Sequence, residues 1–524
     1  MKIALVSPFV ALILVTLIWP SGRIAIAESR RPNILFIMSD DHTSQAVGAY
    51  ASLLKELDPT PTIDRLAREG ICFDNAFCTN GICTPSRACI ITGQYNHNNG
   101  VFDLGGRIER ANQTLPILMR DAGYQTAMIG KWHLKSEPTG FDYWRTLVGQ
   151  GPYYNPPIAQ PGDTTVIEGY TTEVITDIAM NWLTSLRDTE KPFLLMYQHK
   201  APHREWQPGP DYFEMYDGQT FELPETFFDR YENRSSAPAQ AAMRIDNNLS
   251  VTDLKIDPPD NLTEAQLAMW RAYYDPRNQG LDTLSEAELT QWKYNRYMQD
   301  YLRSVKAVDD QVGRVLDYLD ASGLAENTIV IYASDQGWYL GEHGWYDKRW
   351  MYEPSLKTPF LVRWPGVTTA GTRYDGLVSN VDFAPTMLDA AGVSIPESFQ
   401  GHSLRTILSS PGASAESVSV RDDFYYHYYE FPGWHCVRRH YGVRTERYKL
   451  IYFYGIDEWE LFDLQLDPNE VNSVYGELAY AEVEADLKER LARLRAELAV
   501  PEDTRPIYGS CEMNGKPIFT QEDV

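Results

Sequence analysis

Carboxylates follow two apolar runs that have the composition of buried strands. Asp40 and Asp41 end the run that starts after residue 31, and Asp335 and Gln336 end a second run near residue 330. Open α/β sheets collect their ligands at the carboxyl ends of their strands, so we expect these side chains to meet. Adjacent buried carboxylates repel each other and need a counter-charge, and oxygen donors suit Ca²⁺. The pattern therefore predicts a site for a hard divalent cation, the alternative being two solvated turns.

A cysteine begins a second pattern that could do chemistry. The segment from Cys83 to Gly93 fits C-x-P-S-R-x-x-x-[LIM]-T-G at every fixed position. In this segment the chain resembles the sulfatases, the branch of the alkaline-phosphatase superfamily that acts on sulfate esters. In that family a maturation enzyme oxidises the motif cysteine to Cα-formylglycine. The resemblance implies that Cys83 becomes the nucleophile and a ligand of the cation, and that Arg87 holds it.

The resemblance also implies why an aldehyde is needed. One hydroxyl of the hydrated aldehyde attacks sulfur while the sugar alcohol leaves, and the other then loses its proton and expels sulfate. Covalent catalysis of this kind divides one difficult displacement into two easier steps. A bound Ca²⁺ would lower the pKa of the attacking hydroxyl and balance charge on the sulfate oxygens. The family usually has Asp-Asn or Asp-His where this chain has Asp335-Gln336, and Gln keeps the carbonyl donor on a longer arm.

Three further segments resemble the sulfate pocket of the family. The G-K-W-H element gives Lys131 to sulfate binding and His133 to deprotonation of the diol. The A-P-H element gives His203 to sulfate binding and to protonation of the leaving group. The K-x-x-x-Y-E element gives Lys348 to sulfate binding. Taken singly, Lys131 or Lys348 would more often be a solvated surface charge and His203 a loop histidine, and it is the motif context that favours the pocket.

Two stretches, 334–363 and 425–449, are most similar to N-acetylglucosamine-6-sulfatases. Asp347 and Arg349 flank Lys348 and could therefore bind sugar hydroxyls beside the sulfate; the alternative is a surface ion pair. The C-terminal part offers three more candidates for the rim of a cleft, for which we favour a structural role: His435, Arg439 and His440.

The function predicted from these motifs is hydrolysis of a sulfated glycan, with the 6-O-sulfate of N-acetylglucosamine as the preferred substrate. Sulfatases of another glycan position, such as 2-O-sulfated uronate, stay open. So do phosphodiesterases or phosphonate hydrolases of the same superfamily, which share the metal carboxylates. A glycan-binding protein in which Cys83 is never matured is the non-enzymatic alternative.

The elements that must position these residues indicate an α/β fold. Continuous apolar strands are expected near 125–129, 192–197, 328–333 and 359–364, and apolar positions spaced by three and four predict a helix over 294–319. Strands that alternate with helices are typical of a large, mostly parallel mixed sheet sandwiched by helices. The segment 207–290 shows no clear period and is interpreted as an insertion packed over this scaffold. Short strands and a charged helix after residue 415 predict a smaller C-terminal α+β domain.

Composition and charge restrict the partners and the location that we expect for the protein. The 524 residues carry a formal charge of −25, which disfavours nucleic acid as a partner. Residues 1–27 have the positive start, apolar centre and Ala-Ile-Ala end of a signal peptide, so we expect a secreted or periplasmic protein without a membrane span. The expected division is therefore a leader at 1–27, a catalytic domain at 28–414 and a C-terminal domain at 415–524. Four of the six cysteines fall between 72 and 89 with spacings unlike zinc sites, so one or two disulfides stay open.

Overall fold

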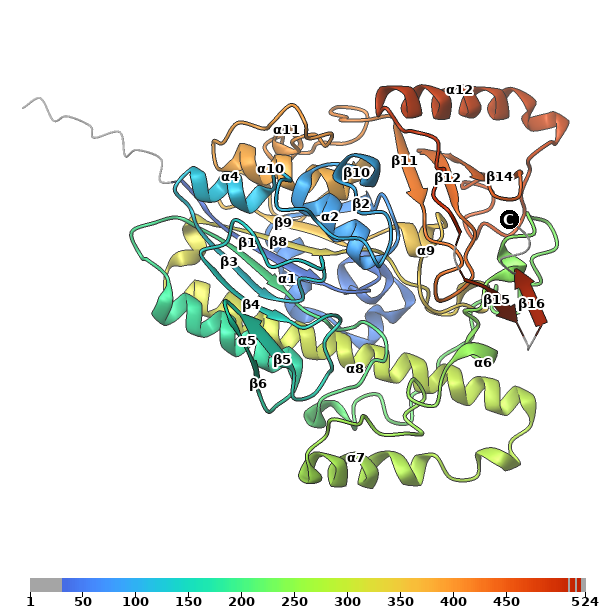
Figure 1. Cartoon of the computed structure of the whole chain (residues 1–524), viewed down its shortest axis with the longest axis horizontal. Helices are drawn as coiled ribbons and strands as arrows, with labels where there is room; N and C mark the ends of the chain where they lie inside the picture. Colours follow the sequence, from blue (N-terminus) through green and yellow to red (C-terminus); the bar gives the residue numbers. More distant parts are fainter. Residues whose placement is uncertain (1–30, 508, 514–515, 520–524) are drawn as a thin grey trace, which may run out of the picture.

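The computed structural model describes residues 31–507, 509–513 and 516–519, so the expected signal peptide lies outside it. A ten-stranded sheet forms the centre of the larger domain (Figure 1). Across the sheet its strands are β10 (Thr372–Ser379), β2 (Ile71–Phe77), β9 (Phe360–Arg363), β8 (Thr328–Ser334), β1 (Asn33–Ser39), β7 (Phe193–Gln198), β3 (Gln125–Gly130), β4 (Tyr143–Leu147), β5 (Pro157–Gln160) and β6 (Asp163–Val166). The run from β8 to β4 is parallel, whereas β9, β5 and β6 are antiparallel to their neighbours. The predicted mostly parallel mixed sheet is confirmed.

The central strands end level with one another. Ser39 of β1 pairs with Ser334 of β8, Met38 of β1 pairs with Gln198 of β7, and Gly130 of β3 also pairs with Gln198. The residues that follow these positions therefore leave the sheet side by side at one edge. This register brings segments from all along the chain to one place.

Both faces of the sheet are covered, as the continuous apolar strands predict. In β1, Ile34, Phe36 and Met38 belong to one core, and Leu35 and Ile37 belong to the other. The first core includes α2 (Cys83–Thr92), α4 (Leu115–Asp121) and α10 (Phe383–Ala390). The second includes α1 (Pro61–Glu69), α5 (Thr171–Asn181) and α8 (Glu286–Ala321). Figure 1 shows the sheet between these two layers.

The long helix α8 starts earlier than the sequence pattern predicts. Its apolar stripe begins near residue 294, but Ser285 and Glu288 form a capping box that starts the helix at Glu286. A second capping box, made by Thr263 and Gln266, starts α7 (Glu264–Arg277) inside the segment without clear period. Capping chemistry, rather than an apolar stripe, fixes both of these helix starts. Short helices complete the set: α3 (Asn96–Asn99), α6 (Ile245–Asn248), α9 (Glu353–Leu356) and α11 (Arg405–Leu408).

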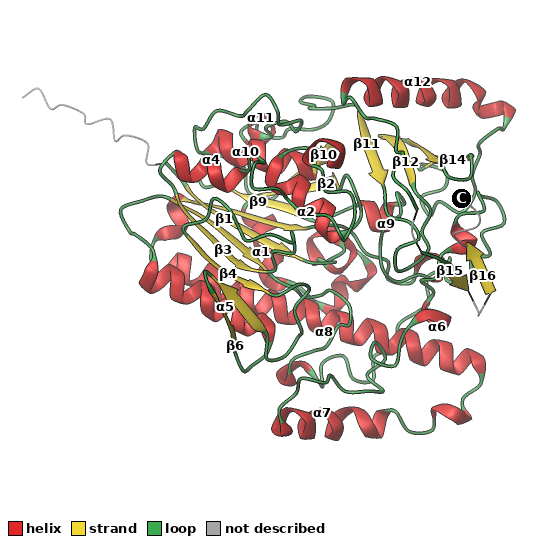
Figure 2. Cartoon of the chain, in the orientation of Figure 1, coloured by secondary structure: helices red, strands yellow, loops and turns green. Residues whose placement is uncertain are grey.

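The C-terminal part forms an antiparallel sheet that lies apart from the central one (Figure 2). Its strands are β11 (Asp423–Tyr428), β12 (His440–Thr445), β13 (Tyr448–Phe453) and β14 (Glu458–Asp463), and α12 (Ala481–Glu497) packs on it. Three of the strands and the helix match the sequence prediction, whereas β11 was not predicted. The loop after β11 is joined to the last described segment by a disulfide between Cys436 and Cys511, where β15 (Cys511–Met513) pairs with β16 (Lys516–Phe519). The four remaining cysteines, Cys72, Cys78, Cys83 and Cys89, are free and buried.

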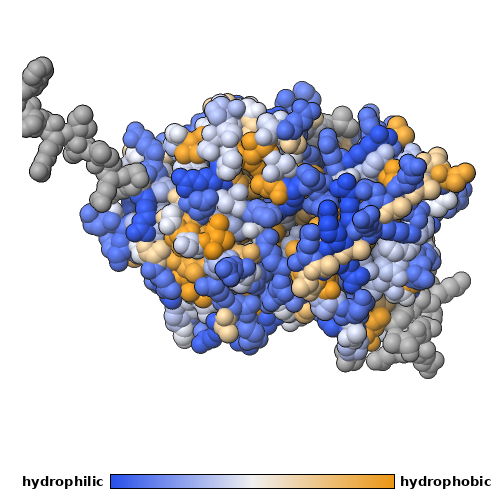
Figure 3. Space-filling model, turned by 90° about the horizontal axis from the view of Figure 1, so that it is seen from above, coloured by the Kyte–Doolittle hydropathy of each residue, from blue (hydrophilic) through white to orange (hydrophobic). Residues whose placement is uncertain are grey.

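Two properties of the described residues bear on the surroundings of the protein. None of their helices combines the length and hydropathy needed to cross a bilayer. On the face drawn in Figure 3, hydrophilic residues predominate and the hydrophobic ones lie in small separate groups.

Candidate active site

Three strand ends supply most of the candidate site. Asp40 and Asp41 follow β1, Asp335 and Gln336 follow β8, and Lys131 follows β3. The turn after β3 requires glycine, because Gly130 has a φ of 105° and an added Cβ would lie 1.9 Å from the carbonyl oxygen of Gln198. The level register described above therefore brings the predicted side chains together.

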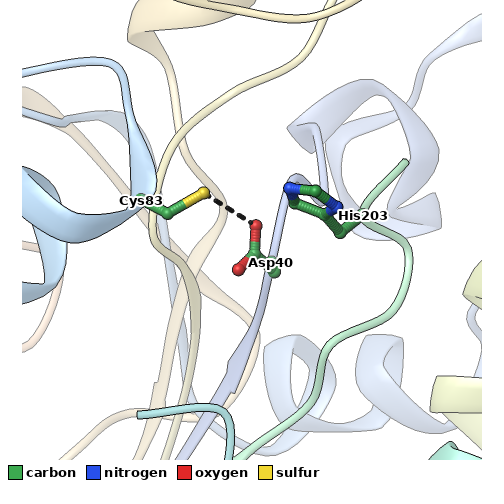
Figure 4. Close-up of side chains that lie close together, drawn as sticks. All are labelled: Asp40, Cys83 and His203. Atoms are coloured by element: carbon green, nitrogen blue, oxygen red, sulfur yellow. Dashed lines mark hydrogen bonds between the residues drawn. The ribbon is translucent and has the colours of Figure 1, made fainter. Parts of the chain in front are cut away.

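Cys83 is the first residue of α2 and lies fully inside this cluster. Its Sγ is 3.2 Å from Asp40 Oδ1, 3.4 Å from Lys348 Nζ and 3.7 Å from Gln336 Nε2. Figure 4 shows the thiol directed at the Asp40 carboxylate, with the His203 ring on the other side of that carboxylate. A thiol from α2 and oxygen donors from two strands thus converge on one point.

The oxygen donors fit a divalent cation. One oxygen each from Asp40, Asp41 and Asp335 lies within 4.8 Å of the others, and all three residues are buried. Asp41 Oδ2 and Gln336 Oε1 are buried without a hydrogen-bond partner, which is costly unless another group satisfies them. A hard cation between the three carboxylates would satisfy Asp41 Oδ2. The three carboxylates therefore fit the predicted cation, whereas Gln336 directs its Nε2 at Asp41 and Cys83, so its amide would have to turn over to present the carbonyl oxygen to the ion.

Three cationic side chains balance the three carboxylates. Arg87 binds Asp335 Oδ2 and Asp40 Oδ2, each at 2.9 Å, while Lys131 contacts Asp40 and Lys348 contacts Asp41. The three positive and three negative formal charges of this cluster therefore cancel. Binding of a divalent cation together with a sulfate dianion would leave the net charge unchanged, because the carboxylates could bind the cation and the lysines could bind the dianion.

Burial and neighbouring charges set the protonation of the carboxylates. Burial would raise the pKa of Asp40, but Lys131 and Arg87 hold that pKa well below its usual range. Burial raises the pKa of Asp41 well above its usual range despite Lys348, and burial and Asp40 raise the pKa of Asp335 despite Arg87. Burial, followed by the Asp40 charge, also raises the pKa of the Cys83 thiol. An unmodified Cys83 is therefore held as a poorly nucleophilic thiol, which agrees with a need to convert it.

Two histidines flank the cluster. Nδ1 of His203 donates to the Arg204 carbonyl at 2.5 Å, so Nε2 is the nitrogen that faces the carboxylates, 3.7 Å from Asp41 Oδ2. His133 lies next to Thr84, with 3.3 Å between its Nδ1 and Thr84 Oγ1. Burial and the Lys131 charge lower both pKa values, to about 2 for His133 and well below the usual range for His203. Both imidazoles are thus neutral at pH 7 and able to accept protons.

A polar cluster adjoins Lys348 on the side of the C-terminal domain. Asp347 accepts from Arg349 Nε at 2.9 Å, and its other oxygen lies 3.1 Å from His435 Nε2. Arg349 also donates to Glu430 at 2.8 Å. From the sequence, Asp347 and Arg349 were expected to be either a sugar contact or a surface ion pair. In the structure both are buried beside Lys348.

The three C-terminal candidates, His435, Arg439 and His440, have different surroundings in the structure. His435 points at Asp347 and joins the cluster. His440 accepts from the Met351 backbone N–H at 3.2 Å and stacks near Trp350, and Arg439 donates to the Arg505 carbonyl at 2.8 Å. The structural role that we favoured for these two residues stays a prediction.

Sequence reasoning missed two glutamines that touch the cationic side chains. Gln198, at the end of β7, accepts from Arg87 at 2.9 Å, and Gln150, in a loop between Gly149 and Gly151, accepts from Lys131. Gln198 follows a predicted buried strand, which is the same signal that identified Asp40. No comparable signal marks Gln150.

Four non-glycine residues of the site have a left-handed backbone. The φ angles are 66° at Asp41, 55° at His133, 74° at Asp347 and 92° at Arg349. Such conformations are unfavourable for these residues and persist where the surrounding structure enforces them, often at functional sites. The backbone is therefore held in place to aim these side chains.

Comparison with known proteins gives matches over most of the chain. A family model described as Sulfatase matches residues 32–393, and a model described as N-sulphoglucosamine sulphohydrolase, C-terminal, matches residues 341–497. An N-acetylglucosamine-6-O-sulfatase of Bacteroides thetaiotaomicron is 44% identical over 506 residues, covering 91% of this chain and 90% of the relative. The human N-acetylglucosamine-6-sulfatase is 28% identical, over 76% of this chain and 67% of its own length.

Solved structures are similar to this chain over most of its length. A protein in complex with its substrate, D-glucosamine-2-N,6-O-disulfate, is similar with a TM-score of 0.86 and 42% identity, over 91% of this chain and 100% of that chain. A phosphonate monoester hydrolase of Agrobacterium radiobacter shares the fold, with a TM-score of 0.65 at 20% identity over 89% of this chain and 96% of that chain.

Proposed function

The chain belongs to the sulfatase family and is a sulfuric ester hydrolase, and from that premise we propose that it removes the 6-O-sulfate of N-acetylglucosamine from a sulfated glycan. The observation that carries the chemistry is the 3.2 Å approach of Cys83 Sγ to Asp40 within a ring of cationic side chains. The sugar is inferred from the relative that is 44% identical and from the similar protein solved with a 6-O-sulfated glucosamine.

We propose that Asp40, Asp41, Asp335, Gln336 and the matured Cys83 hold one Ca²⁺. The three converging carboxylates and the unpartnered Oδ2 of Asp41 support this set. When bound, the ion would balance charge on the sulfate oxygens. We further propose that Cys83 is converted to formylglycine by a maturation enzyme, because its thiol is buried and its pKa is raised.

The residues around this centre have separate tasks in the proposal. Lys131 and Lys348 attract the sulfate, since Lys131 contacts Asp40, and Lys348 contacts Asp41 and lies 3.4 Å from Cys83 Sγ. His203 presents Nε2 to the cluster and would give a proton to the leaving sugar oxygen. Nε2 carries no proton in the neutral ring, so His203 must first be protonated, which the negative charge of a bound sulfate would favour. His133 would take a proton from the diol, and Arg87 holds the head of the nucleophile-bearing helix between Asp40 and Asp335. Preorganised charge of this kind is usually the largest part of such catalysis.

We assign the sugar side of the site to Asp347 and Arg349. Both are buried and charged, and each is oriented by a second residue, His435 for Asp347 and Glu430 for Arg349. Carboxylate and guanidinium groups suit hydrogen bonds to sugar hydroxyls. The buried position of the sulfate pocket favours a sugar at a chain end over one inside a chain.

We also propose that the protein is exported, on the basis of the signal-peptide pattern in residues 1–27. Detection of the mature N-terminus after residue 27 in secreted or periplasmic protein would test this.

A panel of defined sulfated sugars tests the substrate. It contains N-acetylglucosamine 6-sulfate, the 3-sulfate isomer, a 2-O-sulfated uronate and a phosphate monoester. The expected result is a kcat/KM for the 6-sulfate at least about tenfold above every other member, the gap expected when buried polar groups lose their partners. Cys83→Ala should abolish turnover, while Cys89→Ala, which alters another buried thiol of the same helix, should retain it. Preference for another panel member would overturn the sugar assignment.

A further inference from the structure

The loop from Tyr429 to Arg439, which joins β11 to β12, approaches the sulfate pocket. Glu430 near its start binds Arg349, and His435 lies 3.1 Å from Asp347. Those two partners flank Lys348, whose Nζ is 3.4 Å from Cys83 Sγ. The loop is therefore the part of the C-terminal domain that borders the substrate.

This loop is held on both sides of residue 434. The Cys436–Cys511 disulfide ties it to the C-terminal segment, and the Cys436 N–H donates to the Pro432 carbonyl at 3.0 Å. His435 also exchanges backbone and side-chain hydrogen bonds with Ala242, at 2.9 and 2.8 Å. The position of the loop backbone is thus fixed before any substrate arrives.

Within this loop, the Trp434 side chain is directed to solvent. Its exposed fraction is 78%, whereas every other tryptophan in the part of the chain that the structure describes is buried or half-buried. Its neighbour His435 is only 4% exposed and points inward. A large rigid indole is thus presented to solvent one residue away from a group that contacts the sugar side of the site.

We propose that Trp434 is a stacking platform for the second sugar of the substrate, the one linked to the sulfated residue; this rests on the proposed function. His435 contacts Asp347, so in this proposal a sugar seated between Lys348 and Asp347 extends past the loop that carries His435. The apolar C–H face of a pyranose suits the face of an indole, which supplies large contact area at low entropy cost. The chemical class recognised there is a neutral or sulfated pyranose in a glycan chain, so the protein prefers oligosaccharides to the free monosaccharide.

The test compares N-acetylglucosamine 6-sulfate with a disaccharide that carries this sugar at its non-reducing end. Wild-type protein should have the higher kcat/KM on the disaccharide. Trp434→Ala should lower kcat/KM on the disaccharide by about 5- to 10-fold, mainly through KM, and should change the monosaccharide by less than about 2-fold. Trp434→Phe should restore most of the loss, and Trp292→Ala, which alters a half-buried tryptophan under Arg296 on α8, should match wild type on both substrates.

Equal losses on both substrates, or no wild-type preference for the disaccharide, would overturn the platform. Failure of the proposed function looks different, because the wild type would then not hydrolyse the 6-sulfated monosaccharide. In that case the same variants are compared on the sulfated monosaccharide and disaccharide that the enzyme does accept, with the same criteria.

Discussion

At the scale of single residues, the carboxylates at the strand ends and the resemblance of the Cys83 segment to sulfatases predicted which side chains would lie together. Asp40, Cys83 and Asp335 lie far apart in the chain yet meet in one buried cluster. What the sequence could not reveal was which neighbours orient them. Gln150 reaches Lys131 from a loop between two glycines, and His435 reaches Asp347 from another domain. Such contacts depend on how loops pack, for which local sequence carries no signal.

The lysine between Asp41 and the thiol gives a sharp test at this scale. Lys348→Ala should lower kcat/KM by about 10²- to 10³-fold, because it removes a positive charge from a buried site that binds a dianion. Lys357→Ala is the matched control, since Lys357 is half-exposed and faces Glu353 at 3.6 Å. Steady-state kinetics on one sulfated sugar measures both. A loss for Lys348→Ala no greater than for its control would remove Lys348 from the pocket.

At the scale of elements, continuous apolar runs predicted the parallel strands that carry the site. Such runs mark strands covered on both faces, as β1, β7 and β8 are. The predictable strands are thus the ones that end at the ligands. Shorter edge strands escaped notice: β6 is exposed along its whole length and so has no apolar run. The helix starts at Glu286 and Glu264 depend on capping side chains. The periodic spacing of apolar residues, from which the helices were predicted, contains no information on these caps.

The contact between α8 and α1 provides a prediction for pH. Asp309 of α8 accepts from the backbone N–H groups of Ile63 and Thr62 in α1, and burial raises its pKa to about 6, although these bonds and Lys306 oppose the rise. An acid with a higher pKa in the folded state binds its proton more tightly when folded. Its contribution to stability is therefore complete below the unfolded pKa and is lost as the pH rises from about 4 to about 6, by at most about 3 kcal/mol.

Asp309→Asn keeps an acceptor for both N–H groups but cannot titrate. Denaturant unfolding between pH 4 and pH 7 should therefore show a flatter pH dependence for this variant than for wild type. Asp310→Asn, at the adjacent and half-exposed position, should keep the wild-type slope. Identical slopes for Asp309→Asn and wild type would mean that Asp309 is not protonated in this range.

At the scale of the whole molecule, the C-terminal domain completes a site whose chemistry lies in the larger domain. Sequence alone indicated two domains, and only the structure shows that the loop between β11 and β12 contacts Asp347 and Arg349. Pairing of Cys436 with Cys511 was also beyond sequence reasoning, because pairing depends on spatial proximity rather than on spacing. The overall fold class, in contrast, followed from the alternation of strands and helices.

The disulfide should matter for binding more than for chemistry. Replacement of both Cys436 and Cys511 by serine should loosen the loop that carries His435, raising KM for a sulfated sugar about 5-fold, as expected for loss of one hydrogen bond, with kcat changed less than about 2-fold. Reduction of the wild type with dithiothreitol should reproduce the effect, and the double variant should be insensitive to the reductant. An unchanged KM in both cases would separate the disulfide from the substrate site.

The central claim is that Cys83, once converted to an aldehyde, is the group that reacts with the sulfate ester. Mass spectrometry of the peptide ending at Arg87, from protein produced with and without a maturation enzyme, tests it most directly when each sample is also assayed. The account predicts that the peptide loses the Cys83 sulfur and gains an aldehyde oxygen, and that sulfatase activity per molecule rises in proportion to the converted fraction. Full activity in a sample whose Cys83 remains a thiol would contradict it.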